Sequence, residues 1–385
     1  MTGNGRGMGF LARVNMKIII LTIGLILVMG FGHFDSALAQ SAENPVPNMA
    51  YYYIWYAETS WDRAKSDYPQ LGRYSSDDRS VMEQHVKWAK EASIKGFIVS
   101  WKSTLLLNRR LEMLMDVAAK ANFSLWIIYQ GLDFERNPLP VTQIDHDFEY
   151  FVKNYASSPV FKMYDKPVVI WSGTWEFSPA EVNQVTSGYR KDLYILASER
   201  NVDGYKSLAS SVDGDAYYWS SVDPVNQTGY QKKLNEMSAA VHANKGLWIA
   251  PAAPGFDARL LDGKRLIERD NGKTFRLELN AAMRSSPDAI GIISWNEFSE
   301  NSHIEPSVNY GTTALEVLSN GHTSAPVVSD TFDFDSSAIG TSNGPRSDIY
   351  NLGVFGALIA FTVIMIIVAI VRRRGTSDIA PTKPA

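Results

Sequence analysis

The chain has 385 residues and a formal net charge of −4, and it contains no cysteine. The slight acidity argues against nucleic acid as a partner. The lack of cysteine excludes disulfides, thiol catalysis and cysteine-ligated metals, so an exported form of this chain needs a large buried core for its stability.

Residues 1–39 predict a secretory signal peptide. Arg6, Arg13 and Lys17 precede an apolar stretch at 18–30, and a small-residue cleavage pattern follows at 37–39. An uncleaved membrane anchor is the alternative. The apolar stretch is short for a bilayer span, which favours the cleaved signal peptide.

The next region, 49–318, predicts an α/β fold, a single (β/α)8 TIM barrel. Eight apolar runs are each bounded by turn or helix signals, at 49–55, 96–101, 124–130, 167–172, 193–198, 214–219, 246–252 and 289–295. Amphipathic helical patterns separate them, at 77–95, 105–121, 142–155, 179–189, 227–243 and 272–284, and 311–318 closes the set. Strands that alternate with helices predict a parallel sheet, and eight such units fit a closed barrel. We expect Ser76 and Asp77 to cap the first helix.

The C-terminal part predicts a tether and a membrane anchor. Residues 319–350 are rich in small and polar residues and predict a flexible linker, with a short extra β segment as the alternative. Residues 352–371 carry no charge and have the length of a transmembrane helix, with a buried core helix as the alternative. Three arginines begin the tail at 372–385, which should be cytoplasmic. The sequence thus predicts a single-pass protein whose barrel lies outside the cell.

Aromatic residues gather at the C-terminal ends of the predicted strands, where barrel enzymes place their function. Core packing is the simpler explanation for any one of them. As a set at one end of the barrel, aromatic side chains can pack against the faces of sugar rings. We therefore predict an oligosaccharide or polysaccharide substrate, bound by Tyr53, Trp55, Trp101, Tyr129 and Tyr218.

The segment after the last predicted strand carries two glutamates three positions apart, Glu297 and Glu300. Hydrolysis of a glycosidic bond needs one carboxyl group as acid and a second as base, nucleophile or assistant to a neighbouring hydroxyl. We predict that these two are catalytic and that Trp295, Asn296 and Glu305 contact the substrate. A solvated loop is the alternative.

Other reaction classes lack their motifs. The six histidines show no metal-binding spacing, so neither a catalytic metal nor another cofactor is expected. No G-x-S-x-G motif is present, and no set of Ser, His and Asp suggests a serine hydrolase.

The segment from Trp295 to Pro306 resembles the W-N-E-W-H-E-G-T-x-I-E-P signature of glycoside hydrolase family 99, a family of (β/α)8 endo-α-mannosidases and endo-α-mannanases. Further similarity lies at 52–56, 72–74, 96–101 and 253–257. The resemblance implies that Glu297 acts as base on the substrate 2-hydroxyl and that Glu300 is the general acid, with a 1,2-anhydro sugar as intermediate. It also implies that Tyr53, Trp101, Tyr129 and Tyr218 line the pocket.

Four departures from the signature leave the sugar open. They are Phe298 for tryptophan, Ser299 for histidine, Asn301 for glycine and His303 for glutamine. Family 71 endo-1,3-α-glucanases are a weaker resemblance, so an α-glucan substrate stays open. A non-catalytic carbohydrate-binding barrel would also fit the aromatic rim, and so would a role in trimming the cell's own surface polysaccharide.

Overall fold

The computed structural model describes residues 46–133, 135–261 and 263–320, all within one unit that begins at Val46. The predicted signal peptide, the transmembrane helix at 352–371, the tail and nearly all of the linker lie outside these residues. Among the helices that are described, none is long and apolar enough to cross a membrane.

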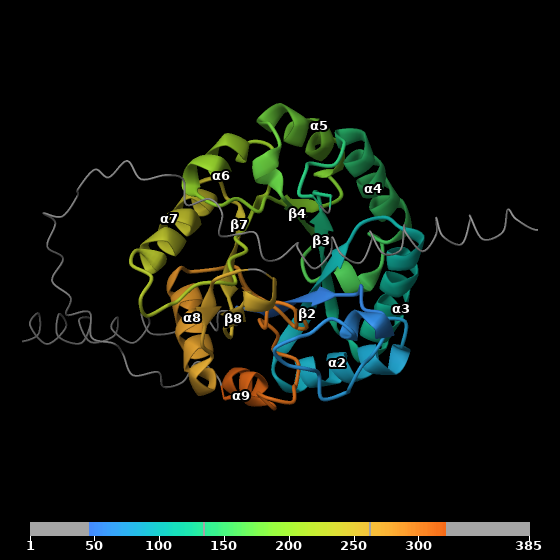
Figure 1. Cartoon of the computed structure of the whole chain (residues 1–385). Coiled ribbons are helices and arrows are strands. Elements are labelled where there is room, and N and C mark those ends of the chain that lie inside the picture. Colours follow the sequence, from blue (N-terminus) through green and yellow to red (C-terminus); the bar gives the residue numbers. More distant parts are fainter. Residues whose placement is uncertain (1–45, 134, 262, 321–385) are drawn as a thin grey trace, which may run out of the picture. The chain divides into compact units, whose positions relative to one another are not determined.

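Eight parallel strands form the barrel, which confirms the predicted fold (Figure 1). They are β1 (Asn48–Tyr53), β2 (Ile94–Trp101), β3 (Ser124–Gln130), β4 (Val168–Ser172), β5 (Tyr194–Leu196), β6 (Gly214–Ala216), β7 (Leu247–Ala252) and β10 (Ala289–Ile292). The hydrogen-bonded order is β5-β4-β3-β2-β1-β10-β7-β6. The ring closes between the two ends of this order, because Ala197 donates to the carbonyl of Gly214 (3.0 Å) and accepts from the N–H of Ala216 (2.8 Å).

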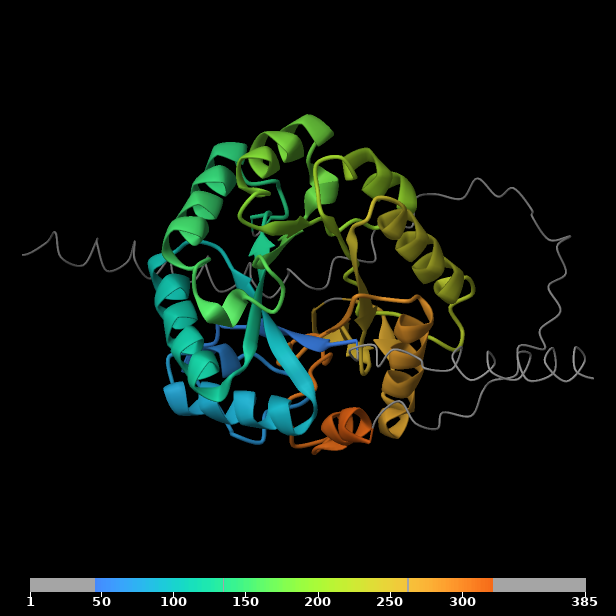
Figure 2. The same cartoon turned by 180° about the vertical axis from the view of Figure 1, so that it is seen from behind.

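Helices surround the barrel on its outside, as both views of the fold show (Figures 1 and 2). They are α2 (Arg79–Glu91), α3 (Leu105–Ala121), α4 (Val141–Asn154), α5 (Pro179–Tyr189), α6 (Val202–Leu208), α7 (Tyr230–Ala243), α8 (Lys273–Arg284) and α9 (Thr313–Ser319). Local capping explains the sharp ends of two of them. Thr104 accepts from the N–H of Leu107 before α3, and Ser178 and Glu181 form a capping box before α5.

Short elements complete the connections between strands and helices. A two-stranded hairpin, β8 (Phe256–Asp257) and β9 (Leu266–Ile267), follows β7. Short 3-10 helices lie at Glu58–Trp61, Pro159–Phe161, Thr174–Glu176, Arg259–Leu261 and Asp270–Gly272. Neither these nor α6 were predicted from the sequence.

The core has two layers, and strand alternation divides residues between them. Inside the barrel, β3 contributes Trp126 and Ile128 to a cluster with residues of the other strands. Between barrel and helices, the same strand contributes Ile127 and Tyr129 to a larger cluster. Successive side chains of a strand point to opposite faces, so a position's parity decides whether it faces the barrel axis or the helices.

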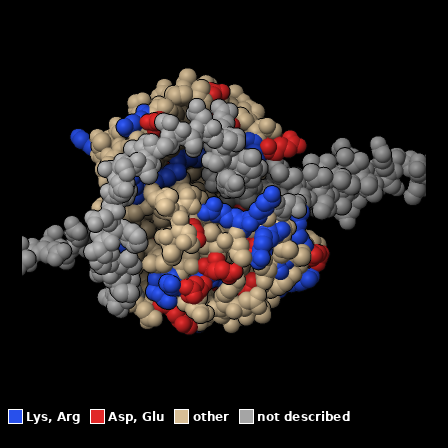
Figure 3. All heavy atoms as spheres, turned by 60° about the vertical axis from the view of Figure 1, so that its left-hand side comes forward, with Lys and Arg blue, Asp and Glu red and all other residues tan. Residues whose placement is uncertain are grey.

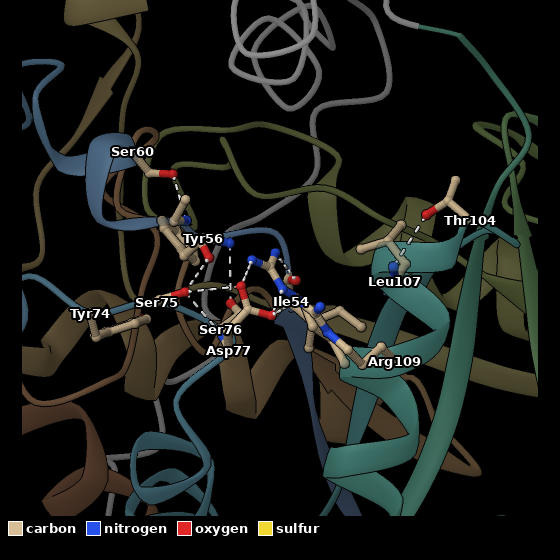
Figure 4. Close-up of polar contacts among 12 residues, drawn as sticks. Ile54, Tyr56, Ser60, Tyr74, Ser75, Ser76, Asp77, Thr104, Leu107 and Arg109 are labelled. Atoms are coloured by element: carbon tan, nitrogen blue, oxygen red, sulfur yellow. Dashed lines mark hydrogen bonds and ion pairs between the residues drawn. The ribbon is translucent and has the colours of Figure 1, made fainter. Parts of the chain in front are cut away.

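The prediction that Ser76 and Asp77 cap the first helix was wrong. Asp78 caps α2 by accepting from the N–H of Ser80 (2.8 Å). The Ser76 hydroxyl instead accepts from the N–H of Tyr56 (3.1 Å), as Figure 4 shows. Asp77 binds two arginines of α3, and these guanidinium groups hold the pKa of its carboxyl well below the usual range.

The Asp77 cluster fixes the C-terminal end of β1. Arg110 forks onto both carboxylate oxygens of Asp77 (3.0 and 2.7 Å) and also donates to the carbonyl of Ile54 (2.9 Å). The chain just after β1 is therefore tied to α3, and the neighbouring Tyr53 and Trp55 are held in place.

Surface charge is mixed on the face shown in Figure 3, where Lys and Arg atoms lie among Asp and Glu atoms. On the described part of that face they form no continuous basic stripe of the kind that nucleic-acid-binding proteins present.

Candidate active site

The loop after β10 folds back on itself. The N–H of Ser294 donates to the carbonyl of Ser302 (2.8 Å), and the N–H of Glu305 donates to the carbonyl of Trp295 (2.8 Å). The Ser294 hydroxyl accepts from the N–H of Glu297 at 2.8 Å. The loop is thus closed at its base, and its turn carries both predicted catalytic glutamates.

Glu297 is buried, with only 1% of its surface exposed. One carboxylate oxygen accepts from the N–H of Ser299 (3.0 Å), and the other has no hydrogen-bond partner within the described structure. Burial raises the pKa of Glu297 to about 7, while the charge of Lys65 and the hydrogen bond from Ser299 act in the opposite direction. A carboxylate with this pKa can accept a proton at neutral pH.

Glu300 is fully buried, and neither of its carboxyl oxygens has a hydrogen-bond partner in the part of the chain that is described. Burial raises the pKa of Glu300 well above its usual value, the charge of Glu297 raises it further, and Arg136 opposes the shift. The shift favours the protonated form of Glu300. Two neighbouring carboxyls whose pKa values are pushed apart can divide the roles of acid and base.

A pocket opens at the C-terminal ends of five barrel strands, and neither Glu297 nor Glu300 is among the residues that line it. It has about 480 Å³ of empty space, its mouth included. Polar groups at the ends of β1, β3, β4, β5 and β6 line it, namely Tyr53, Gln130, Ser172, Ser198 and Tyr218. The amide oxygen of Gln130 is buried without a hydrogen-bond partner among the described residues, and a ligand hydroxyl would supply one.

Tyr53 and Tyr218 connect this pocket to the carboxyl pair. Their hydroxyl oxygens lie 2.7 Å apart. Burial is the largest cause of the raised pKa of both phenols, and the negative charges of Glu297 and Glu300 add to it. The glutamates therefore lie within electrostatic reach of the pocket wall. Trp55 stacks on Tyr53 with 4.2 Å between ring centroids.

Trp101 and Tyr129, both predicted to line the pocket, lie instead in the core between barrel and helices. The indole N–H of Trp101 donates to Asn108 of α3 (2.9 Å). The Tyr129 hydroxyl donates to Asp147 of α4 (3.0 Å). The inward residue at the end of β3 is Gln130, one position after Tyr129. The aromatic rim inferred from the sequence is therefore smaller than expected.

Trp295, Asn296 and Glu305 lie behind the site and have protein partners. Trp295 packs against the ring of Phe97 (5.1 Å between centroids). Asn296 accepts from the N–H of Tyr53 (2.9 Å) and donates to its carbonyl (3.0 Å). These contacts hold the last strand's loop against the end of β1.

Glu305 belongs to a buried polar network. One of its oxygens accepts from the Tyr74 hydroxyl (2.8 Å), and the other lies 3.0 Å from Nε2 of His85. Nδ1 of His85 lies 3.0 Å from the Tyr52 hydroxyl. All of these groups are buried, so the structure gives Glu305 a supporting position rather than an open contact surface.

Sequence reasoning missed several charged groups near the site. Lys65 donates to the Ser299 hydroxyl (3.3 Å) and moderates the pKa of Glu297. Arg136, Glu199 and Arg200 line the pocket. Among these, only Glu199 and Arg200 could have been found from the sequence, because they directly follow the fifth apolar run and therefore lie at the C-terminal end of a predicted strand.

The four departures from the family signature have structural explanations. Asn301 stands where the signature has glycine, and its φ of 51° lies in the left-handed region that asparagine tolerates. Phe298 stacks on His303 with 3.9 Å between ring centroids. His303 is fully buried and lies 3.2 Å from Asp67, so it supports the loop from behind. Ser299 is the partner of Lys65.

Within residues 46–133, 135–261 and 263–320, no group of three or more His, Asp or Glu side chains is placed to hold a metal ion. A (β/α)8 barrel with two buried carboxyl groups after the last strand, and a pocket of aromatic and polar side chains at the C-terminal strand ends, is the arrangement of a glycoside hydrolase.

Comparisons with known proteins agree with this class. The family model for glycosyl hydrolase family 99 matches residues 33–326, and the chain belongs to that family. The glycoprotein endo-alpha-1,2-mannosidase of Rattus norvegicus is 26% identical over 269 residues, which cover 64% of this chain and 58% of the relative. A glycoprotein endo-alpha-1,2-mannosidase-like protein of Homo sapiens is 23% identical over 279 residues, with the same coverage of 64% and 58%. The matches thus span less than two thirds of these relatives.

Solved structures show the same fold. The GH99 endo-alpha-mannosidase from Bacteroides thetaiotaomicron superposes with a TM-score of 0.62 at 20% identity, covering 71% of this chain and 95% of that one. A glycoside hydrolase-like protein superposes with a TM-score of 0.55 at 18% identity, covering 73% of this chain and 95% of that one. At these identities the likeness establishes the barrel architecture alone.

Proposed function

We propose that this protein hydrolyses an α-linked glycan and that an α-mannoside is the substrate. The observation that carries the proposal is the buried pair Glu297 and Glu300. Three of their four carboxyl oxygens lack a hydrogen-bond partner in the described structure. Buried carboxyls without partners destabilise the fold, and such groups are retained where a substrate supplies the missing contacts. Family membership and the mannosidase relatives support the choice of sugar.

In the proposed first step, Glu300 donates its proton to the glycosidic oxygen as the bond from that oxygen to C1 breaks. Glu297 accepts the proton of the substrate 2-hydroxyl, and the 2-oxygen attacks C1 to form a 1,2-anhydro sugar. The raised pKa of Glu300 supports its role as acid, and the pKa of Glu297 near 7 supports its role as base.

In the second step, water adds to C1 and opens the anhydro ring. The Glu300 carboxylate takes a proton from the water, and Glu297 returns its proton to the 2-oxygen. Both carboxyls regain their starting states, and the anomeric configuration is retained. This route requires a 2-hydroxyl trans to the leaving group, which α-mannosides provide.

The pocket supplies contacts for the sugar in this proposal. Tyr53 and Tyr218 are assigned to the reacting end, since both respond to the charges of the two glutamates. Trp55 extends this aromatic surface through its stacking on Tyr53. Further groups that line the pocket offer hydrogen bonds to ring hydroxyls and an aromatic face, namely Gln130, Ser172, Ser198 and Trp175.

We also propose that the barrel at 49–318 works outside the cytoplasm on a membrane anchor. The supports are the signal-peptide pattern at 1–39, the uncharged stretch at 352–371 and the arginines that begin the tail. Protease protection of intact cells tests the topology. Cleavage of the barrel by an external protease is expected, and full protection of the barrel would contradict the proposed orientation.

Glu300→Gln tests the catalytic proposal on α-mannan and α-glucan oligosaccharides. General acid catalysis contributes about 10²- to 10⁴-fold, so we expect a loss of that size with binding retained. Glu135→Gln, an exposed glutamate on the β3–α4 loop, is the matched control and should keep wild-type activity. A wild type that binds these glycans and cleaves none of them would establish a binding barrel instead.

A further inference from the structure

The pocket carries positive charge that a neutral sugar does not require. Arg136 and Arg200 both line it. A third cation, Lys233 of α7, lies behind the wall that Tyr217 forms. Its Nζ lies 4.9 Å from the ring centroid of Tyr217, which lines the pocket, and 4.8 Å from that of Trp219.

Arg200 is held in a fixed orientation. The central carbon of its guanidinium lies 4.0 Å from the ring centroid of Trp175, and both side chains line the pocket. A guanidinium stacked on an indole keeps its N–H groups in the plane of the fork, where they can bind two oxygens of one anionic group. Stacking therefore leaves Arg200 prepared for a planar or tetrahedral anion.

Arg200 repels both Arg136 and Lys233. Burial lowers the pKa of both Arg136 and Lys233, and the charge of Arg200 lowers both further. Glu176 and Glu300 oppose the shift at Arg136. Burial raises the pKa of Glu199, the carboxyl that lines the pocket beside Arg200, while a hydrogen bond with Thr174 and the charge of Arg200 act in the opposite direction. An anion in the pocket would relieve the repulsion between the cations.

We infer that the sugar bound between Arg136, Arg200 and Trp175 carries an anionic substituent, either a carboxylate, a sulfate or a phosphate. The indole binds the ring face, and the two guanidinium groups bind the charged oxygens. This inference rests on the proposed glycosidase function and adds a specificity to it. Arg136 and Arg200 then determine which glycan is cleaved, whereas Glu297 and Glu300 carry out the chemistry.

The test compares four α-manno-oligosaccharides on the full chain. One is neutral, and the others carry at the non-reducing sugar a 6-phosphate, a 6-sulfate or the carboxylate of a uronic acid. At least one anionic form should show a kcat/KM about 10-fold or more above the neutral form, because a charge-assisted fork is worth at least that ratio. Rising salt should raise KM for the anionic form and leave the neutral form unchanged.

Two variants assign the preference to the pocket. Arg200→Gln and Arg136→Gln should each lower kcat/KM for the anionic glycan by a larger factor than for the neutral glycan, so that most of the preference is lost. Arg200→Lys keeps the charge but not the fork and should retain part of the preference. Arg284→Gln, which removes the same charge from the exposed side of α8, should retain all of it. Thermal melting of each variant shows that it is folded.

Equal cleavage of neutral and anionic glycans by the wild type would overturn the inference while leaving the proposed hydrolysis intact. Equal losses on both glycans in Arg200→Gln would also overturn it. If no glycan is cleaved, calorimetric binding of the phosphorylated oligosaccharide decides the matter. Binding that Arg200→Gln weakens supports the anion site although the hydrolase proposal fails, and binding that no variant changes contradicts the site.

Discussion

Tyr53 and Tyr218 join across the mouth of the barrel, with 2.7 Å between their hydroxyl oxygens and 165 positions between them in the chain. Tyr53 ends β1, and Tyr218 follows β6. Both line the pocket, and interaction with Glu297 and Glu300 contributes to the raised pKa of both hydroxyls. This pair therefore connects the sugar-binding wall with the carboxyl pair.

Tyr218→Phe removes one hydroxyl from this pair and leaves the ring. The Tyr53 hydroxyl then loses its fixed partner beside the reacting sugar, so we expect kcat/KM to fall by about 10-fold with a loss of stability near ~1 kcal/mol. Steady-state kinetics and urea unfolding measure the two effects. Tyr194→Phe is the control, because Tyr194 binds the exposed Asp165 through its hydroxyl and should keep full activity. A Tyr218→Phe enzyme with wild-type kinetics would remove the pair from the site.

Glu297→Gln should stabilise the protein at neutral and alkaline pH. Burial raises the folded-state pKa of Glu297 from 4.5 to about 7, so the unfolded chain loses this proton first as pH rises. Wild-type stability therefore falls between about pH 4.5 and pH 7, and a neutral amide avoids the fall. A shift of this size corresponds to a gain on the order of 3 kcal/mol above about pH 7 that vanishes below about pH 4.

Unfolding in urea at acidic, neutral and alkaline pH measures this gain for Glu297→Gln. Glu135→Gln, on an exposed loop, should show none at any pH. A Glu297→Gln protein that is less stable than wild type at alkaline pH would contradict the destabilisation that burial of this carboxylate is expected to cause.

The pH profile of kcat/KM should be bell-shaped. Activity needs Glu297 ionised and Glu300 protonated, so it rises as pH passes the lower pKa of the coupled pair and falls as pH passes the upper one. Lys65 lowers the pKa of Glu297, and Lys65→Met should move the acidic limb to higher pH. Lys87→Met on the exposed side of α2 is the control. An acidic limb that stays fixed in Lys65→Met would show that Glu297 does not set it.

Asn296→Ala should act mainly on stability. Its amide makes two hydrogen bonds to the backbone of Tyr53, and the substitution leaves that buried N–H and carbonyl unsatisfied. We expect a loss of about 2 to 3 kcal/mol. Asn309→Ala offers a comparison, because Asn309 donates to the carbonyl of Ser66 at an exposed position and should cost less. An Asn296→Ala protein as stable as wild type with a raised KM would instead favour the substrate contact expected from the sequence.

The barrel could be predicted because its signals are local. The run at 124–130 coincides with β3, and the patterns at 105–121 and 179–189 coincide with α3 and α5, whose caps are also local. The helix α6 was missed because seven residues are too few for a helical period to emerge.

The two sides of each strand could not be distinguished from the sequence. Strands of a parallel barrel are buried on both faces, so their sequences do not alternate between apolar and polar residues. The sequence of β3 therefore does not show whether Tyr129 or Gln130 faces the barrel axis. Trp101 and Tyr129 were assigned to the pocket from their places at predicted strand ends and from the family resemblance, neither of which shows the strand face that they occupy. Arg136 and Arg200 were not predicted as a pair, because they lie on two loops that are separated in the sequence by α4, β4, α5 and β5. No local pattern indicates that the fold brings both to one pocket.

The anomer that appears first in the digest of an α-1,2-linked manno-oligosaccharide tests the account most directly. Proton NMR of the wild-type digest should show the α-configured reducing end before mutarotation, and Glu300→Gln should release none over the same time. A first-formed β anomer, or release by Glu300→Gln at the wild-type rate, would contradict the assignment of Glu297 and Glu300 as the reacting pair.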